Sequence, residues 1–151
     1  MPQRINILLL VEDDESDIII TKRKISKTTM KINELITCNT LQETKEMLKN
    51  KIIDIVLLDL NLPDSQGLNT LLEVKRVYDG IIIVLTSIDD EQVGIEAIRA
   101  GADDYLVKSH LDETILVNGI YHSKERRKRW ENIDKAQQQI QQLDVMLNKE
   151  V

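Results

Sequence analysis

The residues of this chain that could do chemistry lie directly after short apolar runs. They are Glu12, Asp13 and Asp14 after residues 5–11, Asp59 after 52–58, Thr86 after 81–85, and Lys108 after 105–107. Carboxylates bind hard divalent cations, and an aspartate can also act as a nucleophile. A hydroxyl and an ammonium group can stabilise charge on an incoming group. Together these side chains are suited to the transfer of a phosphoryl group.

The apolar runs have the length and composition of buried β-strands. Four of them, at 5–11, 52–58, 81–85 and 105–107, are rich in Ile, Leu and Val, and 34–38 is a weaker, edge-strand candidate. Helical spacing occupies the segments 18–25, 41–48, 68–77 and 93–98 between them. Continuously apolar strands that alternate with helices predict an α/β fold. We expect a (βα)5 doubly wound parallel sheet of five strands, in the order 2-1-3-4-5, with an extended C-terminal helix.

This topology predicts where a ligand binds. In open parallel sheets the ligand lies outside the carboxyl ends of the strands, where the strand order reverses. Asp13 and Asp59 would flank that point on neighbouring strands, which lie about 4.8 Å apart. Two uncompensated carboxylates repel and raise a pKa, so we expect a small divalent cation, Mg²⁺ or Mn²⁺, between them. Lys108 would add a second positive charge without filling the site of the ion.

Each of these residues also has an ordinary structural explanation. Residues 12–15 could be a solvated acidic loop that favours the positive end of a helix. Asp59 could be a turn residue, Thr86 a helix cap and Lys108 a surface lysine. Because all of them occur at successive strand ends, we favour a functional site over these separate structural explanations. Tyr105 is typical of a packed aromatic, and its place next to the predicted pocket raises the alternative of a switch residue. The two histidines, at 110 and 122, are interpreted as surface residues.

The helix signals include three candidate terminal residues and a long C-terminal pattern. Ser16 is placed to cap the first helix, and Gly80 and Gly101 follow helical segments where a left-handed residue is useful. Beyond Asp112 the helical periodicity continues into a basic stretch and a Gln-rich end. Its apolar residues lie three, four, three and four positions apart, at Ile133, Ala136, Ile140, Leu143 and Leu147. This spacing is that of a short coiled coil, and a solvated tail helix is the equal alternative.

Composition and charge limit the class of protein. The 151 residues carry 20 Lys and Arg against 26 Asp and Glu, a formal charge of -6. This acidity argues against a general nucleic-acid binder, and the basic run 124–129 is interpreted as a solvated helix face. The sequence has neither a membrane-length apolar run nor an export signal. Its one cysteine, Cys38, is expected to be a small buried side chain, which suits a cytoplasmic protein.

Four motifs of the chain resemble those of one known family. They are ILLLVEDDES at 7–16, LLDLNLPDSQG at 57–67, IVLTS at 83–87 and GADDYLVK at 101–108. In sequence and in order they are similar to the receiver domain of two-component response regulators, over about residues 4–125. We therefore expect a receiver domain over residues 1–125 and a helical extension over 126–151, which is a short coiled coil or a linker helix.

The resemblance implies a role for each residue of the predicted site. Asp59 would accept a phosphoryl group from a sensor histidine kinase or a phosphotransfer protein. Asp13 would bind Mg²⁺ directly, Glu12 would act through water, and Asn61 would supply its backbone carbonyl. Thr86 would hydrogen-bond the phosphoryl group and Lys108 would pair with it. Tyr105 would change rotamer when Thr86 moves, and Ser87 would leave phosphoryl access open.

The resemblance also implies a signalling role rather than an enzymatic one. A downstream effector would bind the surface of the fourth helix, fifth strand and fifth helix, and the acyl phosphate would hydrolyse slowly. The C-terminal helix could join two copies of the chain. The cognate kinase, the output pathway and the lifetime of the phosphorylated form do not follow from the sequence.

Two departures from the family pattern and two rival functions need consideration. Ser109 replaces the proline that often follows the lysine, so a cis peptide is not expected there. Gly119 should weaken the fifth helix unless close packing requires it. An aspartate-nucleophile phosphatase of the haloacid-dehalogenase type would need a second Asp where Asn61 stands. An interaction module without the chemistry would lack one of the site residues, and a dinucleotide site would need a glycine-rich turn after the first strand.

Overall fold

The structure is a computed structural model that describes residues 4–149, apart from the side chain of Ile88. Strands and helices alternate along the whole described chain. They are β1 (Arg4–Val11), α1 (Glu15–Ser26), β2 (Lys31–Cys38), α2 (Leu41–Asn50), β3 (Ile55–Asp59), α3 (Leu68–Lys75), β4 (Ile81–Thr86), α4 (Glu91–Arg99), β5 (Asp104–Val107) and α5 (Glu113–Lys149). Short 3₁₀ turns, η1 (Ile88–Asp90) and η2 (Lys108–His110), precede α4 and α5.

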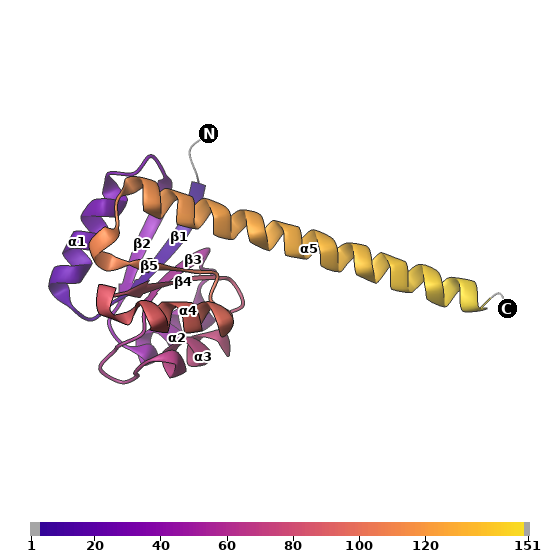
Figure 1. The fold of residues 1–151 in the computed structure, drawn as a ribbon, viewed down its shortest axis with the longest axis horizontal. Coiled ribbons are helices and arrows are strands. Elements are labelled where there is room, and N and C mark those ends of the chain that lie inside the picture. Colours follow the sequence, from indigo (N-terminus) through magenta and orange to yellow (C-terminus); the bar gives the residue numbers. More distant parts are fainter. Residues whose placement is uncertain (1–3, 150–151) are drawn as a thin grey trace.

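The five strands form one parallel sheet in the order β2-β1-β3-β4-β5, which confirms the predicted fold (Figure 1). The order reverses between β1 and β3. In the register of these strands Val11 pairs with Leu58, and Asp59 pairs with Leu85 of β4. The carboxyl ends of β1, β3 and β4 therefore finish at the same edge of the sheet, which is the predicted place for a site.

Helices cover both faces of the sheet, because successive strand residues point to opposite sides. One face packs against α2, α3 and α4 in a core that includes Leu9, Val56, Leu71 and Ala97. The other face packs against α1 and α5, in a core represented by Leu8, Ile25, Leu57, Leu116 and Ile120. Each fully buried Leu or Ile contributes about 1.5–3 kcal/mol to folding. This double burial explains why the strands are continuously apolar.

Two strands differ clearly from their predicted bounds. The candidate at 34–38 is a full eight-residue strand from Lys31, since β2 pairs with β1 along its whole length. The run at 52–58 begins too early, because Ile52 is exposed and β3 starts at Ile55, opposite Leu8 of β1.

Two predicted helix signals were wrong. Asp14, and not Ser16, caps α1: its backbone is extended and its carboxylate accepts the amide N–H of Asp17 at 2.9 Å. Gly80 does not adopt a positive φ, whereas Gly101 does, at 110°. Gly80 is required by packing instead, because a Cβ there would lie 2.3 Å from the Tyr78 hydroxyl. Cys38 is buried as expected.

The last helix, α5, is 37 residues long. Its first part packs on the sheet and its last part extends into solvent (Figure 1). Gly119 lies inside it without breaking it, and a Cβ there would lie 3.4 Å from the Leu106 side chain of β5. Arg127 fixes the helix where it leaves the domain. Its guanidinium binds both carboxylate oxygens of Asp103, at 2.7 and 3.0 Å, and donates to the carbonyls of Asp79 and Gly80. No helix in the described part of the chain has the length and apolarity needed to cross a membrane.

Candidate phosphoryl-acceptor site

Three carboxylates converge at the edge of the sheet where the strand order reverses. Glu12 and Asp13 follow β1, Asp59 ends β3, and each of the three offers an oxygen within 4.8 Å of the others. Glu12 and Asp59 are buried, with 1% and 7% of their surface exposed, whereas Asp13 is exposed. The separation of neighbouring strands sets this spacing, as the sequence predicted.

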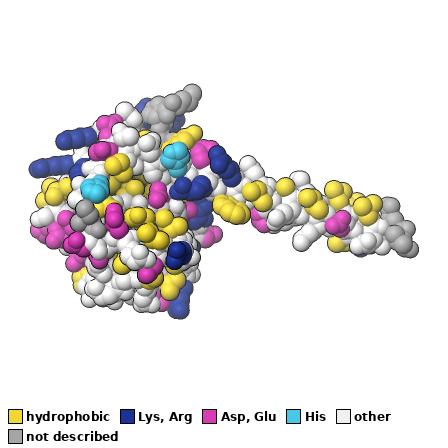
Figure 2. All heavy atoms as spheres, in the orientation of Figure 1, with side chains coloured by type: hydrophobic (Ala, Val, Ile, Leu, Met, Phe, Trp, Pro, Cys, Tyr) yellow, Lys and Arg dark blue, Asp and Glu magenta, His cyan; other side chains and the backbone are white. Residues whose placement is uncertain are grey.

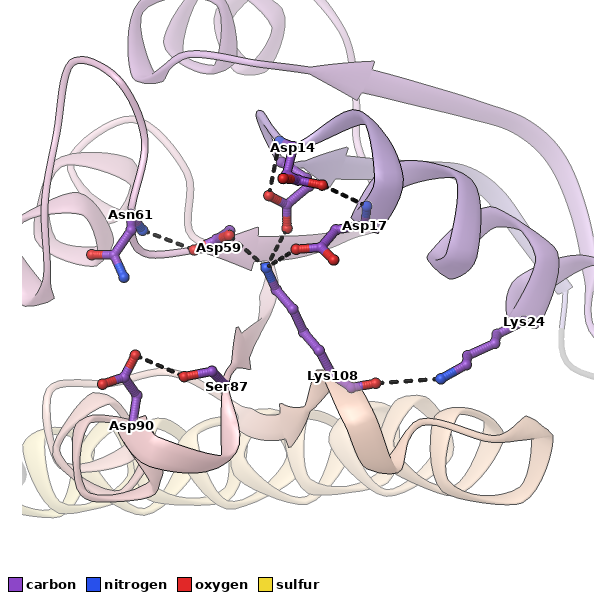
Figure 3. Close-up of polar contacts among 9 residues, drawn as sticks. Asp14, Asp17, Lys24, Asp59, Asn61, Ser87, Asp90 and Lys108 are labelled. Atoms are coloured by element: carbon purple, nitrogen blue, oxygen red, sulfur yellow. Dashed lines mark hydrogen bonds and ion pairs between the residues drawn. The ribbon is translucent and has the colours of Figure 1, made fainter.

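The Lys108 side chain points toward Asp59 (Figure 3). Its Nζ is 2.7 Å from Oδ2 of Asp59 and 2.6 Å from Oε2 of Glu12. Lys108 thus places its positive charge in direct contact with two of the three acids. Buried carboxylates without a counter-charge are costly, which explains why the ammonium reaches between them.

Helix α1 contacts both the side chain and the backbone of Lys108. Asp17 in its first turn places Oδ2 at 3.0 Å from the Lys108 ammonium, and Lys24 in its last turn donates to the Lys108 carbonyl at 3.3 Å (Figure 3). The peptide before Ser109 is trans, as expected, because the described chain contains no cis peptide. Many receivers have a proline directly after the lysine. In this chain that position is Ser109, and contacts from α1 help to fix Lys108.

Burial and charge shift the pKa of two groups in the site. Burial raises the pKa of Glu12 to about 7; Asp59 adds to this rise, and Lys108 opposes it. Burial disfavours the charged form of Lys108, but the carboxylates of Asp59 and Glu12 outweigh it and raise the pKa of Lys108. Lys108 therefore stays charged, while Glu12 titrates near neutral pH.

A hollow of about 220 Å³ opens beside Asp59, between β3, β4 and α4. Its lining includes Asn61, Thr86, Ser87 and Lys108. The Thr86 hydroxyl is buried there without a hydrogen-bond partner among the described residues. A buried hydroxyl that borders a cavity is available to a ligand. Asn61 donates its backbone N–H to Oδ1 of Asp59 at 2.8 Å, which orients the carboxylate.

Tyr105 stands apart from the other predicted site residues. It lies on β5, half-buried, and is not in the lining of the hollow. Its ring packs against Gly94 of α4 so closely that a Cβ on Gly94 would be 2.4 Å from the ring. The ring position therefore depends on a helix residue that has no side chain.

The structure brings Glu12, Asp13, Asp59, Thr86 and Lys108 to one edge of the sheet, with Asn61 and Ser87 beside them. Sequence reasoning missed Asp17, Lys24 and Gly94. Asp17 carried a weak signal as an acid in a first helical turn, but its partner lies 91 positions away. The exposed histidines, at 110 and 122, lie outside the group.

The donor set fits a hard divalent cation. Carboxylate oxygens are the ligands that Mg²⁺ and Mn²⁺ prefer, and several within 4.8 Å can reach one ion. Asp13, which makes no contact with Lys108, has the most accessible carboxylate of the three.

Comparison with known proteins shows the family of the chain. The model of the response regulator receiver domain matches residues 8–119. This chain belongs to that family and is a receiver domain of the two-component systems. A similar curated protein is the transcriptional regulatory protein DpiA of Escherichia coli K12. It is 29% identical over 143 residues, which is 94% of this chain and 62% of DpiA. The chain therefore spans less than two thirds of that relative.

Solved structures show the same fold. The N-terminal signal receiver domain of a response regulator from Bacteroides fragilis has a TM-score of 0.69 and 23% identity, and the match covers 79% of this chain and 96% of that one. A fusion that contains the trimeric coiled-coil segment of yeast Spc42 has a TM-score of 0.72 and 18% identity, over 100% of both chains.

Proposed function

We propose that Asp59 accepts a phosphoryl group from a sensor histidine kinase or a phosphotransfer protein, with Mg²⁺, or alternatively Mn²⁺, at the acidic cluster. One observation carries the proposal: three carboxylates and the Lys108 ammonium meet beside a hollow that a buried, unpaired hydroxyl borders. Asp13, Asp59 and the Asn61 backbone carbonyl would hold the cation directly, and Glu12 would act through water. The bound cation would supply positive charge for the oxygens of the transferring group.

The side chains of the site divide the remaining work. A carboxylate oxygen of Asp59 attacks phosphorus, a new O–P bond forms, and the bond between phosphorus and the donor atom breaks. The Thr86 hydroxyl donates to a phosphoryl oxygen. Lys108, already 2.7 Å from Asp59, pairs with the added negative charge. Ser87 is small and leaves the entrance to the hollow open.

The added charge would act as a switch. A phosphoryl group brings about -1.5 to -2 charges at neutral pH, which draws Thr86 and Lys108 toward it. Displacement of Thr86 would let Tyr105 change rotamer and would alter the surface of α4, β5 and α5. A downstream effector would read that surface. Gly94 is part of it, because it makes room for the ring of Tyr105.

The chain would function as a signalling domain rather than as an enzyme that turns over a substrate. Slow hydrolysis of the acyl phosphate would reset it. Relatives such as DpiA are named transcriptional regulatory proteins, so a transcriptional output is a proposal for any longer protein that contains this chain. The chain is acidic overall, and its four motifs are not basic. We therefore do not propose nucleic-acid binding for the receiver itself.

Intact mass spectrometry tests the proposed acceptor. The chain is incubated with Mg²⁺ and acetyl phosphate, and we expect the mass to rise by one phosphoryl group. Asp59→Asn should show no gain, and Asp13→Asn should show little. Asp14→Asn is the matched control, because the Asp14 carboxylate is occupied as the cap of α1 and asparagine caps equally well. A wild-type chain that is not labelled, or an Asp59→Asn chain that is, would refute the proposal.

A further inference from the structure

The last part of α5 has an apolar stripe that nothing in its own chain covers. Every residue from Lys128 to Lys149 is exposed, and Ile133, Ile140, Leu143 and Leu147 expose between 48% and 62% of their surface. Figure 2 shows hydrophobic side chains along this protruding helix. Most helices in proteins owe their stability to packing of an apolar face. A helix that extends this far into solvent therefore needs a partner on its stripe.

We infer that the partner is a second copy of this chain, bound in parallel as a two-stranded coiled coil. The seam consists of five residues on a heptad repeat, with Ile133, Ile140 and Leu147 at a positions, and Ala136 and Leu143 at d positions. Isoleucine at a together with leucine at d favours two-stranded parallel coiled coils. The inference does not depend on phosphoryl transfer and goes beyond it.

The pairing of seam layers fixes the direction of the two helices. Parallel helices pair a with a and d with d, so all five seam residues meet their own copies. Antiparallel helices pair a with d, which matches Ile133 with Leu143 and Ala136 with Ile140. Leu147 would then face Arg129. The parallel arrangement gives every apolar residue of the seam an apolar partner, whereas this antiparallel arrangement leaves Leu147 against an arginine.

The flanks of the seam do not repel a second copy. The positions beside the seam between residues 132 and 144 are Asn132, Gln137, Gln139 and Asp144, so only one of these four is charged. In a parallel pair Asn132 faces Gln137 of the other helix, and Gln139 faces Asp144. These amide and carboxylate groups can hydrogen-bond across the interface, in the place where coiled coils carry their selective pairs.

The receiver leaves the seam accessible. Each residue turns an α-helix by about 100°, so the seam lies about 145° around α5 from the face formed by Leu116, Ile120 and Ser123, which packs on the sheet. A second helix can therefore lie on the seam while the two receivers point away from it. The Arg127 contacts with Asp103, Asp79 and Gly80 hold this orientation at the exit of the helix.

Sedimentation equilibrium of the full chain at increasing concentration tests the inference. We expect a dimer for the wild type and a monomer for Leu143→Lys. Val145→Lys is the matched control: Val145 is 54% exposed, Leu143 is 58% exposed, and Val145 lies about 160° around the helix from the seam. This control should remain dimeric, as should Asp59→Asn, because the interface is separate from the phosphoryl site. A monomeric or trimeric wild type, or a dimeric Leu143→Lys, would overturn the inference.

Disulfide trapping tests the direction of the helices. In a Cys38→Ala background, Ile133→Cys should form a covalent dimer with itself on oxidation, because residue 133 faces its own copy only in the parallel pair. A mixture of Ile133→Cys and Leu143→Cys chains should not give the mixed dimer preferentially. If the mixed disulfide dominates, the helices are antiparallel and the proposed arrangement is wrong.

Discussion

Lys108 shows most directly how single residues determine the behaviour of this site. Three acids surround its ammonium, and two of them, Glu12 and Asp59, are buried. The lysine offsets the negative charge of the cluster and would compete with the proposed metal ion for the same carboxylates. Its effect on stability and its effect on metal binding are therefore expected to have opposite signs.

Lys108→Met should lower the free energy of unfolding and strengthen Mg²⁺ binding. Without divalent cations at pH 8, the buried acids lose their counter-charge, and we expect a loss of about 1–3 kcal/mol. Mg²⁺ should then stabilise the variant more than it stabilises the wild type. Urea unfolding with chelator and with Mg²⁺ measures both effects, and Lys135→Met on the exposed helix is the control. Equal Mg²⁺ stabilisation of the variant and the wild type would contradict this interpretation.

Glu12 should make the stability of the metal-free protein dependent on pH. Its pKa rises from 4.5 in the unfolded chain to about 7 in the folded protein, chiefly through burial. The folded state therefore binds the proton more tightly, and the contribution of Glu12 to the free energy of unfolding falls as pH rises between these values. Glu12→Gln should remove this fall. Urea titrations of both proteins from pH 4.5 to 8 in chelator test it, and parallel curves would show that Glu12 is not the group responsible.

At the scale of elements, two helical glycines differ in how much room they leave for a side chain. On α4, a Cβ at Gly94 would lie 2.4 Å from the Tyr105 ring, whereas on α5 a Cβ at Gly119 would lie 3.4 Å from Leu106. The first distance requires movement of the ring, and the second is close to ordinary contact. Because alanine favours helix over glycine at both places, packing alone decides the sign of each substitution.

Gly119→Ala should raise the free energy of unfolding by about 0.5–1 kcal/mol. Gly94→Ala should lower it by about 1–3 kcal/mol, because the added methyl group overpacks the contact with Tyr105. Tyr105→Ala should relieve the second effect, so the double variant Gly94→Ala/Tyr105→Ala should be more stable than the sum of the single changes predicts. Urea unfolding of the four variants measures these values. Additive losses at 94 and 105 would mean that the ring does not occupy the space above Gly94.

At the scale of the whole molecule, binding of a cation should stabilise the fold. A ligand that binds only the folded state adds about 2.7 kcal/mol at a hundred times its dissociation constant. We therefore expect Mg²⁺ to raise the melting temperature of the wild type and of Asp14→Asn, but not that of Asp13→Asn. Calorimetry with Mg²⁺ and with chelator measures the difference. A gain that survives in Asp13→Asn would place the cation elsewhere.

The strand order and the fold class could be predicted from the sequence because the strands and helices have clear local patterns. The strands centred on Leu9, Leu57 and Ile83 are apolar on both faces, and a single topology brings Asp13, Asp59, Thr86 and Lys108 to one edge. Weakly patterned elements were less predictable: the half-exposed β2 looked three residues shorter than it is.

Contacts between distant segments could not be predicted. The pairing of Asp17 with Lys108, the packing of Tyr105 on Gly94 and the binding of Arg127 to Asp103 each join residues that no periodicity relates. The cap at Asp14 was missed for a different reason. Asp14 and Ser16 are both good capping residues, and only the backbone angles of the turn decide between them.

The most direct test of the account is to locate the phosphoryl group itself. The chain is phosphorylated with acetyl phosphate in Mg²⁺ and reduced with borohydride, which converts an aspartyl phosphate to homoserine, and its peptides are mapped by mass spectrometry. Our account predicts homoserine at position 59 and at no other acid. Homoserine at Asp13 or elsewhere, or none at position 59, would contradict it.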